Sequence, residues 1–267
     1  MQAPVSVVIP CYKCSHTIEQ SVSSITSQTL LPSEIILVND GSPDQTLEVL
    51  KNLQNTYGKN WIKIIDLPQN VGPGQARNHG WETATQEYLA FLDADDLWHS
   101  QKLEIQCTWM LKNPDISFSG HPFFIYKDIH DLSPAILKGL KQEPRIISKT
   151  QILSSNPFPM SGWLFKRSLQ KKFKPYYHCE DYLWLLESFF TIHQLAFFDL
   201  PLCYSLRAPY SKGGLSGNLW KMEKAELLVY QKIWKEKYIS SLEYGVISLY
   251  SFAKYLRRLL LTFLNPS

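Results

Sequence analysis

The sequence places three carboxylates within four positions, Asp93, Asp95 and Asp96, directly after the apolar run 88–92. Such a run is typical of a strand buried on both faces of a parallel sheet, and ligands of open α/β sheets bind at the carboxyl ends of these strands. Carboxylates this close repel one another unless a positive charge lies between them, and a hard divalent cation provides one. The alternative is structural, with Asp95 or Asp96 capping a helix that begins near Leu97.

Two further polar segments follow strand-like runs. The apolar run 34–38 ends at the polar residues 39–42, and the glycine-rich segment 70–80 leads into a helix. Gly72 and Gly74 allow the backbone to approach a ligand closely, and the start of a helix attracts anions. A tight loop that needs small residues for packing is the alternative. The presence of the acidic strand ends beside this loop favours a ligand site.

An acidic pair, Glu180 and Asp181, lies in the segment 176–190, far along the chain from these residues. The pair opens an amphipathic stretch, where first-turn acids often do no more than complement the helix dipole. An aspartate has an ordinary pKa of about 3.9 and is therefore ionised at neutral pH, ready to act as a base. His178 competes for that role, although a lone histidine is more often a surface or packing residue.

Strand-like and helix-like segments alternate over the first hundred residues, which predicts a parallel sheet with helical crossovers. Ser15 is expected to cap the first helix, and Pro43 with Asp44 to open the second. Strands are expected at 5–9, 34–38, 61–65 and 88–92, and helices at 17–28, from 43 to about 56, and after the glycine-rich segment.

Beyond residue 100 the pattern is less regular. Trp163 suits either stacking on a sugar ring or packing in the core. Residues 208–218 are rich in Pro, Gly and Ser and predict a mobile loop. We expect a helix at 101–111, strands near 116–126, 161–167, 195–199 and 202–207, and a helical tail at 219–237 and 241–264. The predicted fold class is α/β, a mostly parallel central sheet flanked by helices, with a helical C-terminal tail.

The composition sets limits on the function. The chain has 267 residues, 45% of them hydrophobic and 19% charged, which fits a folded globular protein. A net charge of +3 does not indicate a nucleic-acid partner. Cys11 and Cys14 lack a second pair, which argues against zinc and leaves a redox pair as a weak alternative. Reduced thiols and a cytoplasmic location are expected, because the five cysteines are an odd, scattered set with no signal peptide before them. Separately, no apolar stretch reaches the roughly 18 residues of a membrane span.

Four segments in this order and spacing resemble the family 2 glycosyltransferases, whose fold is named GT-A. They are Ser6–Pro10 with Tyr12, Val38–Ser42, Gly74–Gly80 and Phe91–Asp96. The resemblance covers the first hundred residues. It implies an inverting hexosyl- or N-acetylhexosaminyl-transferase of polysaccharide biosynthesis, which uses a nucleotide-diphosphate sugar, usually linked to UDP, and either Mn²⁺ or Mg²⁺.

The resemblance also implies roles for single residues. Asp95 resembles the metal-binding aspartate of the family's D-x-D motif, with Asp93 as its partner. Asp181 occupies the position of the base that takes the acceptor's proton, and Glu180 is the second choice. The chain departs from the family at Asn39, where a first aspartate is common. The implied nucleotide-binding residues are Pro10, Tyr12, Asp40, Arg77, Asp93 and Arg207, with Asp40 on the base, Tyr12 stacking nearby and Arg207 reaching the diphosphate.

By the same resemblance, residues 1–218 form the catalytic domain, with a nucleotide-binding half at 1–100, an acceptor-binding half at 101–218 and a helical extension at 219–267. The implied partners are the sugar nucleotide and a glycan or lipid-linked saccharide acceptor. Residues 241–264 combine adjacent arginines with an apolar face. This helix either lies on the inner face of the cytoplasmic membrane, or docks on the catalytic domain or on a second copy in a homo-oligomer.

Two other classes remain as alternatives. A sugar-1-phosphate nucleotidyltransferase is expected to carry a glycine-rich, basic loop right after its first strand, and residues 11–15, Cys-Tyr-Lys-Cys-Ser, do not fit that pattern. A non-catalytic sugar-nucleotide or glycan-binding protein on the same fold is the other. The presence of both Asp95 and Asp181 argues against it, because a degenerate relative is expected to lose one of them.

Overall fold

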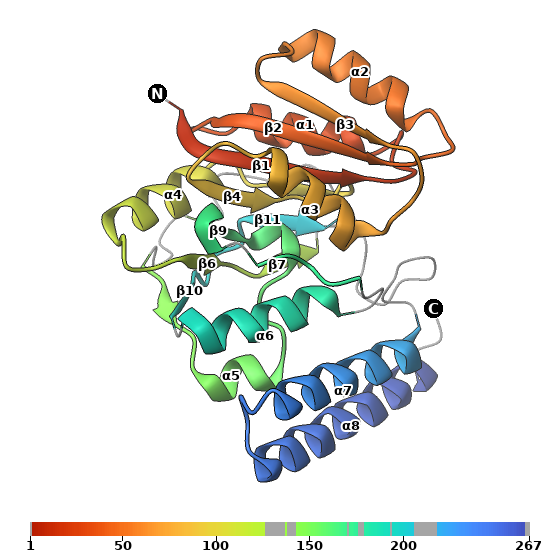
Figure 1. Ribbon diagram of the computed structural model, residues 1–267, viewed down its shortest axis with the longest axis vertical. Coiled ribbons are helices and arrows are strands. Elements are labelled where there is room, and N and C mark those ends of the chain that lie inside the picture. The colour runs from red at the N-terminus through yellow and green to blue at the C-terminus, as the bar shows by residue number, and fades with distance from the viewer. Residues whose placement is uncertain are drawn as a thin grey trace.

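The computed structural model describes residues 2–125, 137, 143–169, 171–175, 179–192, 194–205 and 218–264 (Figure 1). The strands are β1 Ala3–Cys11, β2 Pro32–Asp40, β3 Ile62–Leu67, β4 Tyr88–Phe91, β5 Asp96–Trp98, β6 Phe118–Gly120, β7 Phe123–Ile125, β8 Arg145–Ile146, β9 Leu164–Lys166, β10 Leu195–Phe197 and β11 Cys203–Ser205. The helices are α1 Ile18–Thr26, α2 Thr46–Tyr57, α3 Pro73–Thr83, α4 Lys102–Lys112, α5 Lys149–Ser154, α6 Glu180–Ile192, α7 Leu219–Lys235 and α8 Ser241–Leu264.

The first half of the chain builds the predicted parallel sheet. In the order β3-β2-β1-β4, each strand pairs in parallel with its neighbour, and the helices between them return the chain to the same edge. Strand β1 is longer than predicted and includes Pro10. Because β4 pairs only with Val5–Val8, Pro10 lies beyond the end of β4, where its missing N–H breaks no bond to that strand.

The second half adds strands of both directions. Strand β9 lies antiparallel between β4 and β6, and the sheet ends with β10 and β8. A second small sheet has the order β5-β11-β7. Residues 96–98 are therefore a strand, and the alternative that Asp95 or Asp96 caps a helix near Leu97 is wrong. That segment pairs with β11 from far along the chain, and the following helix, α4, begins only at Lys102.

Alternation along the strands divides the core between the two faces of the sheet. Val8, Leu89 and Phe91 point to one face, whereas Val7 and Ala90 belong to the other. Helices α3 and α6 cover the first face, through residues such as Trp81 and Trp184. Helices α1, α2 and α4 cover the second face, through Val22, Leu50 and Leu103. The result is a sheet with helices on both sides, as predicted.

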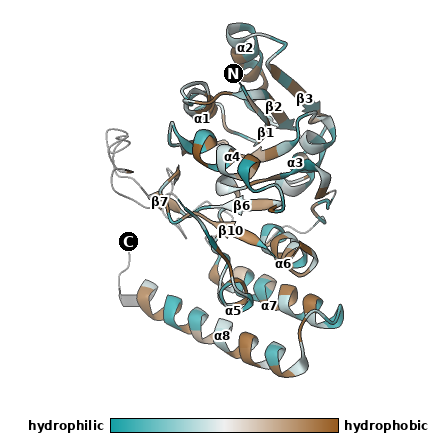
Figure 2. Cartoon of the chain, turned by 90° about the vertical axis from the view of Figure 1, so that its left-hand side faces the viewer, coloured by the Kyte–Doolittle hydropathy of each residue, from teal (hydrophilic) through white to brown (hydrophobic). Residues whose placement is uncertain are grey.

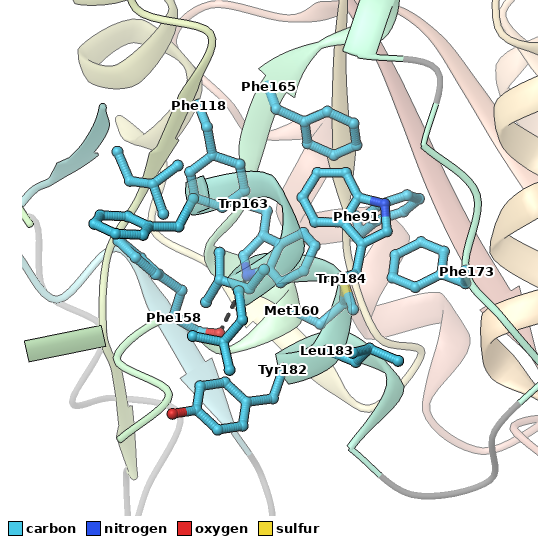
Figure 3. Close-up of a cluster of buried hydrophobic side chains, with 14 of the residues drawn as sticks. Phe91, Phe118, Phe158, Met160, Trp163, Phe165, Phe173, Tyr182, Leu183 and Trp184 are labelled. Atoms are coloured by element: carbon cyan, nitrogen blue, oxygen red, sulfur yellow. Dashed lines mark hydrogen bonds between the residues drawn. The ribbon is translucent and has the colours of Figure 1, made fainter. Parts of the chain in front are cut away.

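Aromatic side chains fill the face between the sheet and α6 (Figure 3). The ring centroids of Trp163 and Trp184 are 5.0 Å apart, and those of Phe91 and Phe165 are 5.5 Å apart. Trp163 is fully buried, and its indole N–H donates to the carbonyl oxygen of Phe158 at 3.1 Å. Trp163 therefore packs in the core and is not available to stack on a sugar ring.

Two predicted helix starts are wrong by a few residues. The hydroxyl of Ser15 does not cap α1 but donates to the Asp44 carboxylate at 3.1 Å. Helix α2 begins at Thr46 rather than at Pro43, because Asp44 accepts a hydrogen bond from the backbone N–H of Thr46 just outside the helix. The first difference arises from a contact between two loops that lie far apart in the sequence, and the second from a local turn at Asp44.

The predicted helical tail is present as the hairpin α7–α8. Figure 1 shows the two helices side by side at the end of the molecule farthest from α2, with α6 between α7 and the sheet. The hydroxyl of Tyr182 in α6 donates to the carbonyl oxygen of Ile152 at 2.7 Å, and that of Tyr230 in α7 donates to the carbonyl oxygen of Leu153 at 3.0 Å. Within the described part of the chain, none of the helices is long and apolar enough to cross a bilayer.

Candidate active site

Three chemically important side chains from distant parts of the chain meet at the carboxyl edge of the parallel strands. Arg77 on α3 lies 2.5 Å from Asp93, which follows β4, measured from Nη2 to Oδ1. Its other terminal nitrogen lies 3.8 Å from Oε1 of Glu180, the first residue of α6. The arginine side chain is only 7% exposed. Arg77 therefore joins the D-x-D segment to the acidic helix start.

Glycine positions bring α3 close enough to make these contacts. A Cβ atom on Gly80 would lie 2.2 Å from Cγ1 of Val8, so the helix packs directly on β1 only because that side chain is absent. At the other end of the helix, the position of a Cβ on Gly74 is 3.1 Å from Oε1 of Glu180. The glycine-rich segment is predicted to approach a ligand closely; in the structure its glycines allow it to approach Val8 and Glu180.

Glu180 is a buried acid with an altered pKa. Burial raises its pKa to about 7, and the charges of Asp181 and Asp93 add to that effect, although Arg77 opposes it. A carboxyl group with this pKa is present in both its protonated and its ionised form near neutral pH. Because Arg77 contacts both Glu180 and Asp93, these two carboxyl groups lie on either side of one guanidinium group.

Asp181 lies next to Glu180 in sequence but has different partners. The side-chain amide of Asn156 donates to its Oδ2 at 3.0 Å. Burial raises the pKa of Asp181, and a hydrogen bond from the backbone of Tyr182 and the charge of Arg77 oppose that rise. A carboxylate held by one neutral amide keeps acceptor capacity for a proton. Asn156 was missed at the sequence level, because nothing in its local sequence places it against α6.

The D-x-D segment is held in shape by Ser161. Its hydroxyl accepts a hydrogen bond from the backbone N–H of Asp93 at 3.0 Å and donates to Oδ2 of Asp96 at 2.6 Å. Burial raises the pKa of Asp96 to about 7, with the charge of Asp93 as the next cause. Asp96 is therefore a structural acid of this loop, and Ser161 is a second residue that sequence reasoning missed.

Asp93 and Asp95 fit the donor set of a hard cation. Both side chains are half-buried, and the charges of both raise the pKa of Asp96. No group of three His, Cys, Asp or Glu side chains gathers for metal binding among the described residues. Mg²⁺-type sites use one or two protein carboxylates together with phosphates and water, so two aspartates are a sufficient protein contribution.

The second acidic strand end, Asp40, holds the glycine-rich loop. Its buried carboxylate accepts hydrogen bonds from the backbone N–H groups of Val71 at 2.7 Å and Gly72 at 3.0 Å. Gly72 has φ +88°, a conformation that other residues rarely adopt. Asn39 at the end of the same strand donates to Asp66 at 2.7 Å. The departure from the family at Asn39 thus supplies an amide that ties β2 to β3.

The other predicted nucleotide-site residues are placed in part. Tyr12 follows β1 and is 44% exposed, with the ammonium group of Lys13 5.3 Å from its ring centroid. Pro10 lies two residues before Tyr12, within β1. Tyr12 is therefore accessible to a planar ligand at the same sheet edge. Arg207 and the competing base His178 lie outside the described residues.

An amide clamp joins the two halves of the site. The side chain of Asn78 on α3 donates to the carbonyl oxygen of Phe173 at 2.8 Å and accepts from its backbone N–H at 2.9 Å. Nearby, Lys174 pairs with Glu187 of α6 at 2.7 Å. The segment before α6 is thereby fixed to the glycine-rich helix. A single asparagine with this double role could not be distinguished by sequence from one that contacts a ligand.

Comparison with known proteins places this chain in a family. The model of the family described as "Glycosyl transferase family 2" matches residues 6–173. The Escherichia coli protein WfgD, named UDP-Glc:alpha-D-GlcNAc-diphosphoundecaprenol beta-1,3-glucosyltransferase, is 33% identical over 184 residues, which cover 68% of each chain.

Two solved structures share the fold. A structure of S. aureus TarS 1–349 with UDP-GlcNAc is similar with a TM-score of 0.67 and 20% identity, over 97% of this chain and 72% of that one. The mannosyltransferase PcManGT from Pyrobaculum calidifontis, in complex with GDP-Man and Mn²⁺, has a TM-score of 0.69 and 15% identity, over 100% of this chain and 77% of the other. The architecture is thus the predicted GT-A fold. The chain belongs to glycosyl transferase family 2.

Proposed function

We propose that this protein is an inverting glycosyltransferase that moves a hexosyl or N-acetylhexosaminyl group from a UDP-sugar to a hydroxyl of a lipid-linked saccharide. The observation that carries the proposal is the contact of Arg77 with both Asp93 and Glu180, at 2.5 and 3.8 Å. It brings the segment expected to face the donor and the helix expected to carry the base into one site. The diphosphoundecaprenol-linked substrate in the name of the E. coli relative supports the class of acceptor.

Asp181 acts as the base. It takes the proton of the acceptor hydroxyl as that oxygen attacks the anomeric carbon, and the bond from this carbon to the diphosphate breaks on the opposite side. A single displacement of this kind inverts the anomeric configuration, and UDP leaves with the bonding electrons. Burial and the bond from Asn156 hold the carboxylate in place, and its raised pKa makes it a stronger base than an ordinary aspartate.

Asp93 and Asp95 are the residues that would hold Mn²⁺ or Mg²⁺. A bound cation at this place supplies compensation for the negative charge that develops on the leaving diphosphate. Arg77 adds a fixed positive charge against Asp93, and the buried pair with Glu180 orients its guanidinium group. Charge compensation by preorganised groups requires little rearrangement during the reaction.

The remaining assignments divide the chain. Residues 1–100 bind the nucleotide, with Pro10, Tyr12 and Asp40 at the base. Asp40 also anchors the loop at 70–72, so its replacement would disturb both functions. Residues 101–218 bind the acceptor, with Arg207 on the diphosphate, and residues 219–267 form the extension. The protein would work at the inner face of the cytoplasmic membrane, where a lipid-linked acceptor is accessible.

The proposal is tested by incubating the purified protein with UDP-glucose, UDP-GlcNAc, UDP-galactose, UDP-GalNAc or GDP-mannose. Each reaction contains Mn²⁺ or Mg²⁺ and a short-chain polyprenyl diphosphate-linked GlcNAc. Metal-dependent release of UDP, together with an inverted anomeric configuration in the product by NMR, is expected for one UDP-sugar. Retained configuration would contradict the single displacement. If donors raise the melting temperature but no nucleoside diphosphate is released with any of them, the protein is a binder and the proposal is wrong.

A further inference from the structure

Helix α8 presents an apolar face to solvent. Leu242, Leu249 and Leu260 are 78%, 74% and 63% exposed, although they are among the most apolar residues of the chain. Figure 2 shows α8 at the edge of the molecule, with apolar residues along its length. The same face includes Val246, Tyr250, Phe252, Leu256 and Leu261, all of them exposed. An exposed apolar surface of this extent marks a binding surface.

The packing of α8 on its neighbours uses the opposite face. The hydroxyl of Ser251 donates to Glu223 of α7 at 3.0 Å, and Lys254 pairs with Glu226 at 3.0 Å. The rings of Trp234 and Tyr244 stack with centroids 5.0 Å apart. Polar and aromatic groups of the inner face make these contacts within the hairpin, whereas the outer leucines Leu242, Leu249 and Leu260 remain mostly exposed.

Beyond Glu243, the charged residues of α8 are all basic. Between residues 244 and 264 the sequence contains Lys254, Arg257 and Arg258 and no acidic residue. The side chain of Arg257 is exposed. Glu243 at the start of the helix pairs with Lys149 at 2.5 Å. Lys254 and Arg258 face the hairpin, where their charges lower the pKa of Glu226, so Arg257 is the cation that the outer side of the helix exposes. An exposed cation within an apolar face is complementary to a surface that is negative at the level of its headgroups and apolar below them.

The width of the face distinguishes a bilayer from a second copy of the helix. Residues 242, 246, 249, 253, 256 and 260 follow the three-and-four spacing of a helix pair, which requires a narrow seam with charged residues beside it. Here the flanking positions include Tyr250, Phe252, Leu259 and Leu261, so the apolar arc covers about half of the helix. An arc of that width suits partial immersion in a lipid surface.

We propose that α8 lies flat on an anionic lipid bilayer, with its outer leucines among the acyl chains and Arg257 at the headgroups. This inference rests on the proposed function, because it places the enzyme where a lipid-linked acceptor is found. Lys254 donates to the carbonyl oxygen of Ser154 at 2.6 Å, and Asn156, two residues later, holds Asp181. Docking through α8 therefore fixes the base side of the site relative to the bilayer.

The test is co-sedimentation of the full chain with vesicles of phosphatidylcholine alone and of phosphatidylcholine with phosphatidylglycerol. Binding to the anionic vesicles is expected, with weakening by salt and by Arg257→Gln. In the double variant Leu249→Gln with Leu260→Gln the partition coefficient is expected to fall at least about tenfold, because two leucines lose their transfer free energy. Leu228→Gln, which changes an exposed leucine of α7, is the matched control and is expected to bind as the wild type does.

Three results would overturn the inference. The first is the absence of binding to anionic vesicles, and the second is equal binding by the wild type and the double variant. The third is a dimer that the double variant converts to monomers, with no vesicle binding, which assigns the face to a second copy. Transfer to a short-chain, water-soluble acceptor is measured in parallel and is expected to be unchanged in the double variant. Vesicle binding without transfer would reject the proposed function alone, and transfer without vesicle binding would reject this inference alone.

Discussion

Glu180 and Asp181 show how two adjacent acids acquire different properties from their partners. Glu180 faces a buried guanidinium group, whereas Asp181 is held by the neutral amide of Asn156. Arg77 opposes the effect of burial on the pKa of both acids, and the pKa of both is raised nevertheless. The difference between them is geometric: the contact with Arg77 assigns Glu180 to the orientation of that guanidinium group and leaves Asp181 as the proposed base.

Replacement of the proposed base provides the first prediction. Asp181→Asn is expected to lower kcat for transfer by about 10²–10⁴-fold, because the amide cannot take the hydroxyl proton. Donor binding, measured by calorimetry with UDP and Mn²⁺, is expected to stay within a few-fold of wild type. Glu180→Gln serves as the comparison and should retain more activity. If Glu180→Gln is the inactive variant and Asp181→Asn is active, the assignment of the base is reversed.

The pKa of Asp181 leads to a second prediction, on pH dependence. Burial raises this pKa, and the base works only when deprotonated, so activity rises with pH through the raised value. The acid limb of kcat/KM for the free enzyme is therefore expected above about 3.9, the ordinary pKa of an aspartate. The measurement is a kcat/KM profile with saturating metal. An acid limb at or below the ordinary value would contradict the burial of the working base.

The D-x-D segment gives a third prediction. Asp95→Asn is expected to lower metal-dependent turnover by about a hundredfold or more, because one of two proposed carboxylate ligands is lost. Titration of Mn²⁺ by calorimetry in the presence of UDP should show weaker binding. Asp115→Asn, at an exposed position of a loop, is the control for the loss of one negative charge. Unchanged Mn²⁺ affinity in Asp95→Asn would remove this residue from the proposed metal site.

At the scale of the elements, sequence patterns predicted what depends on strand alternation and strand ends. The buried strands and their parallel pairing follow from periodicity and from the alternation of strands and helices, whereas the assignment of residues 77 and 93 to one site comes from the resemblance to family 2 glycosyltransferases. Ser161 and Asn156 could not be predicted, because each reaches its partner across at least 25 positions of sequence. The short strand β5 could not be predicted either, since its partner β11 lies about a hundred residues away.

One buried acid joins several elements of the parallel sheet. Glu34 on β2 accepts hydrogen bonds from Ser6 of β1 at 2.5 Å and from the backbone of Thr85 at 2.7 Å, and pairs with Lys63 of β3 at 2.5 Å. Burial raises its pKa, but Lys63, Ser6 and Thr85 outweigh this effect and lower the pKa to about 2. The ionised form is therefore part of the folded structure.

The fourth prediction concerns this network. Glu34→Gln is expected to lower the free energy of unfolding by roughly 2–3 kcal/mol at neutral pH, because Lys63 and the hydroxyl groups lose a charged partner. The contribution of Glu34 is complete above about pH 4.5 and is lost as the pH falls through about 2, so the variant and the wild type should converge in acid. Urea unfolding across this range measures the difference. Glu48→Gln on the exposed face of α2 is the control, and an equal loss there would contradict a specific role.

At the scale of the whole molecule, side-chain contacts join the glycine-rich helix α3, the segment before α6 and the helices α5–α7 around the site. The Asn78 clamp fixes the glycine-rich helix to the segment before α6, and Lys174 continues this connection to Glu187. Tyr182 and Tyr230 join α5, α6 and α7 through the carbonyl oxygens at 152 and 153. The helices α7 and α8 thus support the helix that carries the proposed base, and a disturbance of α7 is transmitted to α6 through these packing contacts.

The fifth prediction tests this coupling through Lys254, which joins α8 to Glu226 of α7 and to the carbonyl oxygen of Ser154. Burial raises the pKa of Glu226, but Lys254 and Tyr230 outweigh this effect and the pKa is lowered. Lys254→Met removes the cation, so the free energy of unfolding should fall by about 1–3 kcal/mol at neutral pH.

Because a carboxyl group with a lowered pKa stabilises the fold above its unfolded pKa of about 4.3, the loss in Lys254→Met should shrink as the pH falls below that value. Denaturant unfolding at neutral and acid pH measures this, with Lys221→Met on the exposed face of α7 as the matched control. Melting of α7–α8 as a separate transition in the wild type would contradict the coupling. A single transition that moves with Lys254 places the tail and the base in one cooperative unit, because contacts shared by two elements make them unfold together.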